Sequence, residues 1–340
     1  MPTCVFFDPS QKAGSRPMKI AVSIINYKTV DLTLSCVQSV MTDRASPDVP
    51  ETEIIVVDNL SEDGSVEILR AWIAQNAPNG GVTLVESNSN SGFSGGHNQG
   101  IQAAKADAYL VLNSDAVIRP GFLAAMARAA AETPTAGMFG PRIEHENGEQ
   151  AVSCFRTHNI ASEVIRGAIF GPVTRLLSRF DVPLQMPPKP DQIAWASFAC
   201  ILIRADVIAQ IGPMDEGYFL YFEDVEYSLR AGNAGWSVAY VPDASAMHMR
   251  GGSGPVASLK AARKRLPKYF YVSRSRMYYQ IGGRPYLLAA NLGWYLGRLL
   301  SFGRLLTGKP RVPANGHEAR DIWIGFGDPM HPYRPEGNTP

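Results

Sequence analysis

The amino-acid sequence predicts an α/β fold with a mostly parallel central sheet flanked by helices. Short β-branched runs alternate with segments whose apolar residues recur at helical spacing, the pattern of strands joined by helical crossovers. Several of these runs end at a polar residue, as expected at the ligand-binding edge of such a sheet. The 340 residues, 45% hydrophobic and 19% charged, suffice for one large globular domain with appendages.

The first half of the chain carries the regular part of this pattern. Buried strands are expected at residues 20–25, 54–57, 82–85 and 109–112. After the first strand, Leu32, Cys36 and Val40 recur at helical spacing, and a second helix is expected after the second strand. Pro120 stands before a helix at 121–132, a position where its missing N–H group costs nothing.

The second half is less regular. Residues 142–190 look loop-rich, and their PLQMPPKP stretch is typical of an extended linker or mobile flap. Strands are expected at 198–203 and 237–241, and a short helix at 225–233. Beyond Gly254 the pattern becomes basic and helical.

The net charge of +1 conceals an uneven distribution of acidic and basic residues along the chain. No Asp or Glu lies between Ala244 and His317, whereas Lys and Arg are frequent there, which suggests an anionic partner such as a membrane surface or nucleic acid. The four cysteines lack disulfide or metal-ligand spacing, and no secretory signal or spanning helix is evident. A reducing, cytoplasmic location is therefore expected.

The expected strand ends bring polar residues to one rim of the sheet. They are Asn26 with Tyr27, Asp58 with Asn59, and the triplet Asn113, Ser114 and Asp115. A carboxylate at a rigid strand end is well placed to hold Mg2+ or Mn2+ against a diphosphate. The alternative for the triplet is an Asx-turn.

Two further segments suit a nucleotide ligand. The Asp58 carboxylate can accept from the N3–H of uracil or thymine, whereas Asp63 and Ser65 are better placed to cap the next helix. The glycine-rich segment 90–100 leads into a helix, so its backbone N–H groups can approach an anion. Within it, His97 is expected to be a positioned loop residue.

Acid–base chemistry is predicted from adjacent carboxylates in the second half. Glu223 and Asp224 follow an aromatic run at a helix start, where adjacent buried carboxylates are costly unless they face a cleft or a cation. Because they should point to different sides, one can act as a base while the other is structural. The alternative is helix N-terminal capping. His248 follows a late strand and is either packed or a metal ligand.

Together and in this order, these segments resemble the inverting family 2 glycosyltransferases of the GT-A fold, especially the bacterial rhamnosyltransferase-like branch. The resemblance covers residues 20–253, through VSIINYKT, IIVVDNLSEDGS, NSGFSGGHNQGI, YLVLNSDAVIRPGFL, the segment ASFACILIRADVIAQIGPMDEGYFLYFEDVEYSLRAGNAGW, and MHMRGG. One departure is Asn113, which stands at the first position of the acidic metal motif.

The resemblance implies a role for each matching residue. Nucleotide contacts are expected from Asn26, Tyr27, Asp58, Asn90, Gly92, Phe93, Asn98 and Asn113. Asp115 and His248 would be the metal ligands, and Asp224 the catalytic base, with Glu223 as the second candidate. Trp195 and residues 198–203 would border the acceptor.

The resemblance also implies a domain division and a reaction. The expected parts are a leader (1–17), a GT-A catalytic domain (18–253) with a nucleotide-binding half (18–135) and an acceptor half (136–253), a basic helical extension (254–313) and a tail (314–340). The expected donor is a dTDP- or UDP-sugar, with dTDP-rhamnose first. The acceptor would be a glycan or a lipid-linked sugar in cell-surface polysaccharide synthesis.

Two alternatives stay open at this point. The chain could be a catalytically inactive scaffold that binds a nucleotide sugar without turnover. Residues 260–309, in which Arg284, Asn291 and Arg298 recur among leucines, could lie peripherally on the inner face of the cytoplasmic membrane or pack in a protein interface. No nucleic-acid partner is expected, because no stacking motif of a known module is present.

Overall fold

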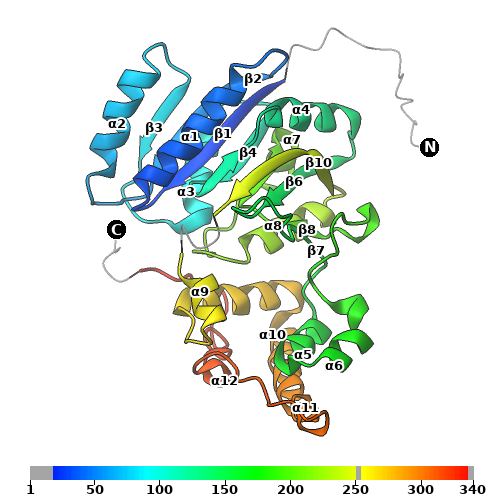
Figure 1. Ribbon diagram of the computed structural model, residues 1–340. Helices are drawn as coiled ribbons and strands as arrows, with labels where there is room; N and C mark the ends of the chain where they lie inside the picture. Colours follow the sequence, from blue (N-terminus) through cyan, green and yellow to red (C-terminus); the bar gives the residue numbers. More distant parts are fainter. Residues whose placement is uncertain (1–17, 250–253, 336–340) are drawn as a thin grey trace, which may run out of the picture.

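The computed structural model describes residues 18–249 and 254–335 (Figure 1). The expected leader, and the last five residues of the expected tail, lie outside the described residues. An eight-stranded sheet forms the upper part of the molecule in Figure 1, and a helical layer formed largely by the C-terminal residues lies below it.

The sheet has the strand order β3-β2-β1-β4-β9-β6-β10-β5. Its strands are β1 (Lys19–Asn26), β2 (Glu51–Asp58), β3 (Val82–Glu86), β4 (Ala108–Asn113), β5 (Ala116–Ile118), β6 (Ala136–Glu144), β9 (Cys200–Arg204) and β10 (Ser237–His248). Only β9 and β5 among them run against the other strands. The expected mostly parallel sheet is confirmed.

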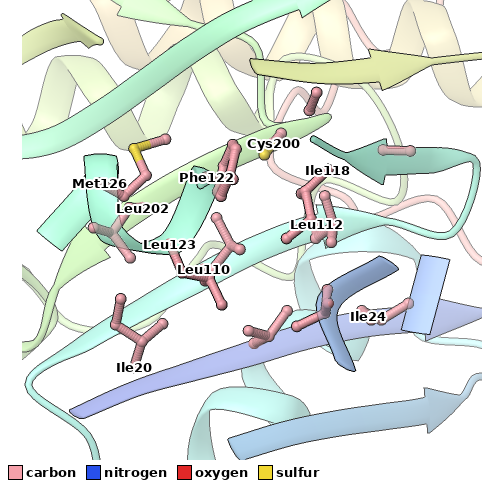
Figure 2. Close-up of a cluster of buried hydrophobic side chains, with 14 of the residues drawn as sticks. Ile20, Ile24, Leu110, Leu112, Ile118, Phe122, Leu123, Met126, Cys200 and Leu202 are labelled. Carbon is pink, nitrogen blue, oxygen red and sulfur yellow. The ribbon is translucent and has the colours of Figure 1, made fainter. Parts of the chain in front are cut away.

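Helices cover both faces of this sheet. They are α1 (Val30–Arg44), α2 (Ser65–Asn76), α3 (Gly92–Gln102), α4 (Phe122–Glu132), α7 (Ala205–Ile211) and α8 (Glu223–Asn233). Side chains such as Ile24 and Leu112 pack with Phe122 in one buried cluster (Figure 2), whereas Ile55 and Tyr109 belong to a cluster on the other face. Burial on both faces explains why these strands are almost continuously apolar.

The loop-rich character expected for residues 142–190 is partly wrong. This region contains α5 (Ile160–Ala168), α6 (Gly171–Leu176) and the short strand β7 (Cys154–Phe155), which pairs with β8 (Trp195–Ala196) just beyond it. The Asn159 side chain accepts from the N–H of Ser162 (2.9 Å), and the Ser162 hydroxyl lies 3.0 Å from the Asn159 N–H. This capping box starts α5, whose buried face contains the charged residue Glu163 and so hides the apolar periodicity.

The C-terminal extension is helical, as expected. It contains α9 (Val256–Ala261), α10 (Lys268–Leu300) and α11 (Gly303–Leu306), and α10 bends at Gly282 and Gly283. The expected tail also contains a short helix, α12 (Glu318–Asp321). The second part of α10 packs on α5, where a Cβ on Gly297 would overlap the carbonyl oxygen of Val164. Within the described parts of the chain, no helix is long and apolar enough to cross a bilayer.

A buried ion network holds α5 against α10. Glu163 accepts from the Arg274 guanidinium (2.8 Å), the Tyr278 hydroxyl (2.9 Å) and Arg166 (2.6 Å). Burial alone would raise the pKa of Glu163, but the adjacent charges of Arg166 and Arg274 hold it well below its usual value. The buried Arg274 charge is therefore neutralised by a carboxylate of the preceding half of the chain.

Candidate active site

Polar residues at the ends of β1, β2 and β4 lie along one edge of the sheet. The β1–β2 pairing places Asn26 opposite Asp58, and the β1–β4 pairing places Ile25 opposite Asn113. In this register the parallel strands β1, β2 and β4 end at nearly the same height in the sheet. Tyr27, one residue beyond β1, is 43% exposed at this rim.

Asp58 is held within the rim by hydrogen bonds. Its carboxylate accepts from the Nδ2 of Asn26 (2.7 Å), the backbone N–H of Ser61 (3.0 Å) and the Ser61 hydroxyl (2.6 Å). The Oδ1 of Asn26 accepts from the Thr33 hydroxyl (2.8 Å). The buried Asn26 and Asp58 thus tie two strand ends together, while Tyr27 borders the neighbouring cavity.

The glycine-rich segment expected to be a loop is mostly helix: residues 92–100 lie in α3, so His97 is a helix residue and not a loop residue. We call residues 90–93, where the chain enters α3, the glycine-rich turn. Gly92 has a φ of +70°, and a Cβ there would overlap the carbonyl oxygen of Phe219, so the position requires glycine. The N–H of Phe93 donates to that same carbonyl (2.7 Å). The Nδ2 of Asn59 donates to the side chain of Asn90 (3.1 Å) and to the carbonyl of Gly92 (3.0 Å). The turn is thereby fixed to β2 and to the segment before α8.

Asn98, on α3, makes a structural contact. Its Nδ2 donates to the carbonyl of Met214 (2.9 Å), and its Oδ1 accepts from the Met214 N–H (3.0 Å). This paired contact fixes the turn before Tyr218 against α3. Asn98 borders neither of the two cavities described next.

A cavity of about 260 Å³ lies between the rim and the glycine-rich turn. Five of the expected nucleotide contacts border it, namely Tyr27, Asn90, Gly92, Phe93 and Asn113. Tyr269 and His97 border it as well. The Nδ1 of His97 lies 2.9 Å from the Ser23 hydroxyl, and burial lowers the pKa of His97 to about 3, so its ring is neutral at physiological pH.

Asp115 and His248 meet at the far end of this rim. The Oδ1 of Asp115 lies 3.1 Å from the Nε2 of His248, and the Asp115 carboxyl is fully buried. The Nδ2 of Asn113 lies 3.5 Å from the same imidazole nitrogen. The two expected metal ligands therefore lie next to Asn113, whose amide stands at the first position of the acidic metal motif.

The donor set of Asp115 and His248 fits one small divalent cation. Two ligands each about 2.1 Å from an ion lie about 3 Å apart when they subtend a right angle, which matches their separation. Carboxylate and imidazole are both ligands of first-row divalent ions. Residues 18–249 and 254–335 contain no group of three or more His, Cys, Asp or Glu side chains that would enclose a metal. Further ligands would then come from a substrate or from water.

Glu223 and Asp224 open α8 after two residues in the left-handed region. Tyr221 and Phe222 have φ values of +71° and +69°, an unfavourable conformation for side-chain-bearing residues that positions the carboxylates. Burial raises the pKa of Asp224 to about 7, although N–H groups including that of Val225 (2.9 Å) oppose the shift. Burial and the charge of Asp224 raise the pKa of Glu223 well above its usual value.

A second cavity of about 550 Å³ contains both carboxylates. The expectation that Glu223 and Asp224 point to different sides is wrong, because both border this cavity together with Asp115 and His248. The positive-φ residues before α8 turn the start of the helix towards it. Asn113 and Phe93 border both cavities, which therefore adjoin, and we call the two together the cleft.

Several residues of the cleft escaped the sequence reasoning. Lys260 of α9 borders the catalytic cavity, and burial together with the Arg166 charge lowers its pKa to about 8. Tyr221 borders it too, whereas Phe198 borders it as expected. Trp195 borders an adjoining cavity with His158. The absence of acidic residues around Lys260 was the signal in the sequence, but nothing there connected it to the strand ends.

The comparisons with known proteins agree on a family. The model of the family described as "Glycosyltransferase like family 2" matches residues 17–268. The chain is 31% identical over 230 residues to N-acetylglucosaminyl-diphospho-decaprenol L-rhamnosyltransferase of Mycobacterium tuberculosis, covering 62% of this chain and 72% of that protein.

Solved structures resemble the fold. One is the S. aureus TarS 1–349 structure, with a TM-score of 0.53 and 15% identity over 92% of this chain and 80% of that one. Another is the mannosyltransferase PcManGT from Pyrobaculum calidifontis in complex with GDP-Man and Mn2+, with a TM-score of 0.50 and 17% identity over 93% and 86%. At these identities the similarity concerns the fold.

Proposed function

Because the chain belongs to glycosyltransferase-like family 2 and is a glycosyltransferase, we propose that it is an inverting, metal-dependent enzyme that glycosylates a lipid-linked acceptor. The observation that carries this proposal is the pair of adjoining cavities that make up the cleft. One part lies against the glycine-rich turn, and the other joins Asp115 and His248 to Glu223 and Asp224. Such a cleft can hold a nucleotide sugar and an acceptor end to end.

The donor would lie with its nucleotide in the smaller cavity. Tyr27, Asn90 and Phe93 border that cavity and offer a ring face and an amide to the nucleoside. Asp58 is buried and borders neither cavity, so we propose that its three hydrogen bonds fix the strand ends beside the nucleotide. We infer dTDP-rhamnose as the donor, with support from the rhamnosyltransferase relative.

The transfer would be a single displacement. Asp224 takes the proton from an acceptor hydroxyl while its oxygen attacks the anomeric carbon from the side opposite the leaving group. The bond from that carbon to the donor phosphate oxygen breaks, and its electron pair leaves with the nucleoside diphosphate. One attack from the opposite side inverts the anomeric configuration. Burial and the charge of Asp224 raise the pKa of Glu223, which favours its protonated form beside the proposed base.

Asp115 and His248 would hold Mn2+ or Mg2+. The ion, when bound, would neutralise charge on the departing diphosphate. The Mn2+ in the complex of the structurally similar mannosyltransferase supports this assignment.

Lys260 would mark the acceptor side. Its Nζ lies 4.4 Å from the centre of the Phe270 ring, and no carboxylate pairs with it among the described residues. A partly desolvated ammonium in a cavity with catalytic carboxylates suits an anionic ligand. We infer that it contacts a phosphate of a lipid-diphosphate acceptor, the class named for the mycobacterial relative. Such an acceptor fits a cytoplasmic protein working at the inner membrane face.

The first test is a thermal-shift panel of nucleoside diphosphates and nucleotide sugars with and without Mn2+. A ligand that binds only the folded state raises the melting temperature by mass action. We expect Mn2+-dependent stabilisation by dTDP and dTDP-rhamnose, followed by transfer to a prenyl-diphosphate-linked sugar with inversion visible by NMR. Stabilisation without transfer to any acceptor would favour the inactive scaffold, and stabilisation by no nucleotide would refute nucleotide-sugar binding.

A further inference from the structure

The second part of α10 is apolar on two opposite faces. One face contains Leu287, Ala290 and Trp294, which are buried among neighbouring helices. The opposite face contains Leu288, Leu292, Leu296 and Leu299, spaced by four, four and three residues, and all are exposed. A helix that is apolar all round is normally covered on every side. Here one side is open.

The open face continues into α11 and forms a ridge. We define the α10–α11 ridge as the exposed leucines 288, 292, 296, 299, 305 and 306, of which Leu299 is 65% and Leu306 91% exposed. Figure 1 places α11 at the end of the molecule farthest from the sheet. The ridge is therefore a projecting apolar surface.

The charges next to the ridge are positive and lack acidic partners. Arg304 donates to the carbonyls of Pro310 and Ile169, and Arg311 donates to Ser301 and to the carbonyl of Arg298. Carbonyls and hydroxyls orient these guanidinium groups but do not neutralise them. Since no Asp or Glu occurs between Ala244 and His317, the chain segment that contains the ridge carries a net positive charge.

From this combination we propose that the α10–α11 ridge docks the enzyme on an anionic lipid surface. Leucines enter the interface between headgroups and acyl chains, and cations such as Arg304 and Lys309 face acidic headgroups. A two-fold dimer through the ridge would instead bring the same cations of two copies together. The choice of a lipid surface rests on the proposed function, in which the acceptor is lipid-linked. Vesicle binding can nevertheless be measured without any glycosyl transfer, so the two proposals can fail separately.

The experiment is flotation of the full chain with vesicles of phosphatidylcholine alone or with phosphatidylglycerol. We expect binding to the anionic vesicles that weakens at high salt. The double variant Leu299→Glu with Leu306→Glu should lose at least about tenfold in partition coefficient, or about 1.4 kcal/mol. The matched control is Ile68→Glu on α2, also an exposed apolar residue (47%), which should bind as the wild type does.

Further measurements distinguish a lipid surface from a second copy of the chain as the partner that covers the ridge. They also distinguish a failure of the docking proposal from a failure of the proposed function. Equal binding of wild type and double variant, or no vesicle binding, would overturn the lipid assignment. So would sedimentation showing a wild-type dimer that the double variant dissociates, since a second copy would then cover the ridge. Loss of vesicle binding with retained transfer to a short-chain soluble acceptor supports both proposals. If no acceptor is glycosylated but the variant still loses vesicle binding, only the proposed function fails.

Discussion

The carboxylate of Asp115 lies 3.1 Å from the imidazole of His248, although the two residues are far apart in the sequence. The contact follows from strand pairing. β5 begins at the residue after Asp115 and pairs antiparallel with the end of β10, with Ala116 opposite His248. The pair is thus fixed by backbone hydrogen bonds and is preorganised before any ligand binds.

Replacing either member of this pair should remove metal-dependent donor binding. His248→Ala and Asp115→Ala each delete one of two protein ligands, and even outer-shell changes at metal sites cost about 10- to 100-fold in affinity. We expect at least that loss for Mn2+ in the presence of dTDP, measured by titration calorimetry. His331→Ala, an exposed histidine outside the cleft, is the control. Unchanged Mn2+ affinity in both site variants would remove the metal assignment.

Asp224→Asn should abolish most turnover while sparing the donor site. General base catalysis contributes about 10²- to 10⁴-fold, so kcat should fall within that range. The dTDP affinity should stay within about twofold, since Asp224 does not border the nucleotide-side cavity. Asp206→Asn, an exposed aspartate in the first turn of α7, is the matched control. Near-normal kcat in Asp224→Asn would transfer the base role to Glu223.

The rate of transfer should rise with pH through about 7. Burial raises the pKa of Asp224 to about 7, so the carboxyl is protonated and cannot accept a proton at lower pH. The same shift disfavours the ionised carboxylate in the folded state. The protonated Asp224 side chain therefore contributes to the stability of the folded state below the pKa of aspartate in the unfolded chain. This contribution is lost as the pH rises through about 7. The pH profile of kcat checks the predicted rise in rate. The melting temperatures of the wild type and Asp224→Asn across the same pH range check the predicted loss of stability.

The rim of the site was predictable because it depends on strand ends. Asn26, Asp58 and Asn113 follow apolar runs, and parallel strands in register must finish at one edge. The runs also located most of the central strands to within a few residues. Sequence reasoning did not show that Asn26 and Asp58 bond mainly to each other and to Ser61, since residue 61 lies in a loop without periodicity.

The remaining parts of the cleft depend on contacts without a local pattern. β5 has three residues, too few for any period to appear, yet it brings Asp115 to His248. The left-handed residues Tyr221 and Phe222 are aromatic rather than glycine, so the turn that directs Glu223 and Asp224 into one cavity carried no conventional signal.

Gly92→Ala should weaken both folding and donor binding. The new methyl group would meet the carbonyl oxygen of Phe219, and the left-handed φ of +70° would add about 1 kcal/mol of strain. Gly121→Ala is a close control, because its φ is +83° but nothing lies within 4 Å of the added Cβ. Gly121→Ala should therefore show the strain alone, and Gly92→Ala a larger fall in melting temperature together with weaker dTDP binding. Equal falls would show that the Phe219 contact adjusts at little cost.

Lys260→Met should impair use of a phosphate-bearing acceptor and leave the donor site intact. The substitution keeps an apolar stem of similar length next to Phe270 but removes the charge that borders the catalytic cavity. We expect the KM for a lipid-diphosphate acceptor to rise about tenfold, as for the loss of one charge-assisted hydrogen bond of about 1.4 kcal/mol. Because burial and the Arg166 charge lower the pKa of Lys260 to about 8, the wild-type KM should also rise as the pH passes 8, whereas that of the variant should not. Lys264→Met, an exposed residue just beyond α9, is the control. If both variants show the same KM and the same pH profile as the wild type, the acceptor phosphate binds elsewhere in the cleft.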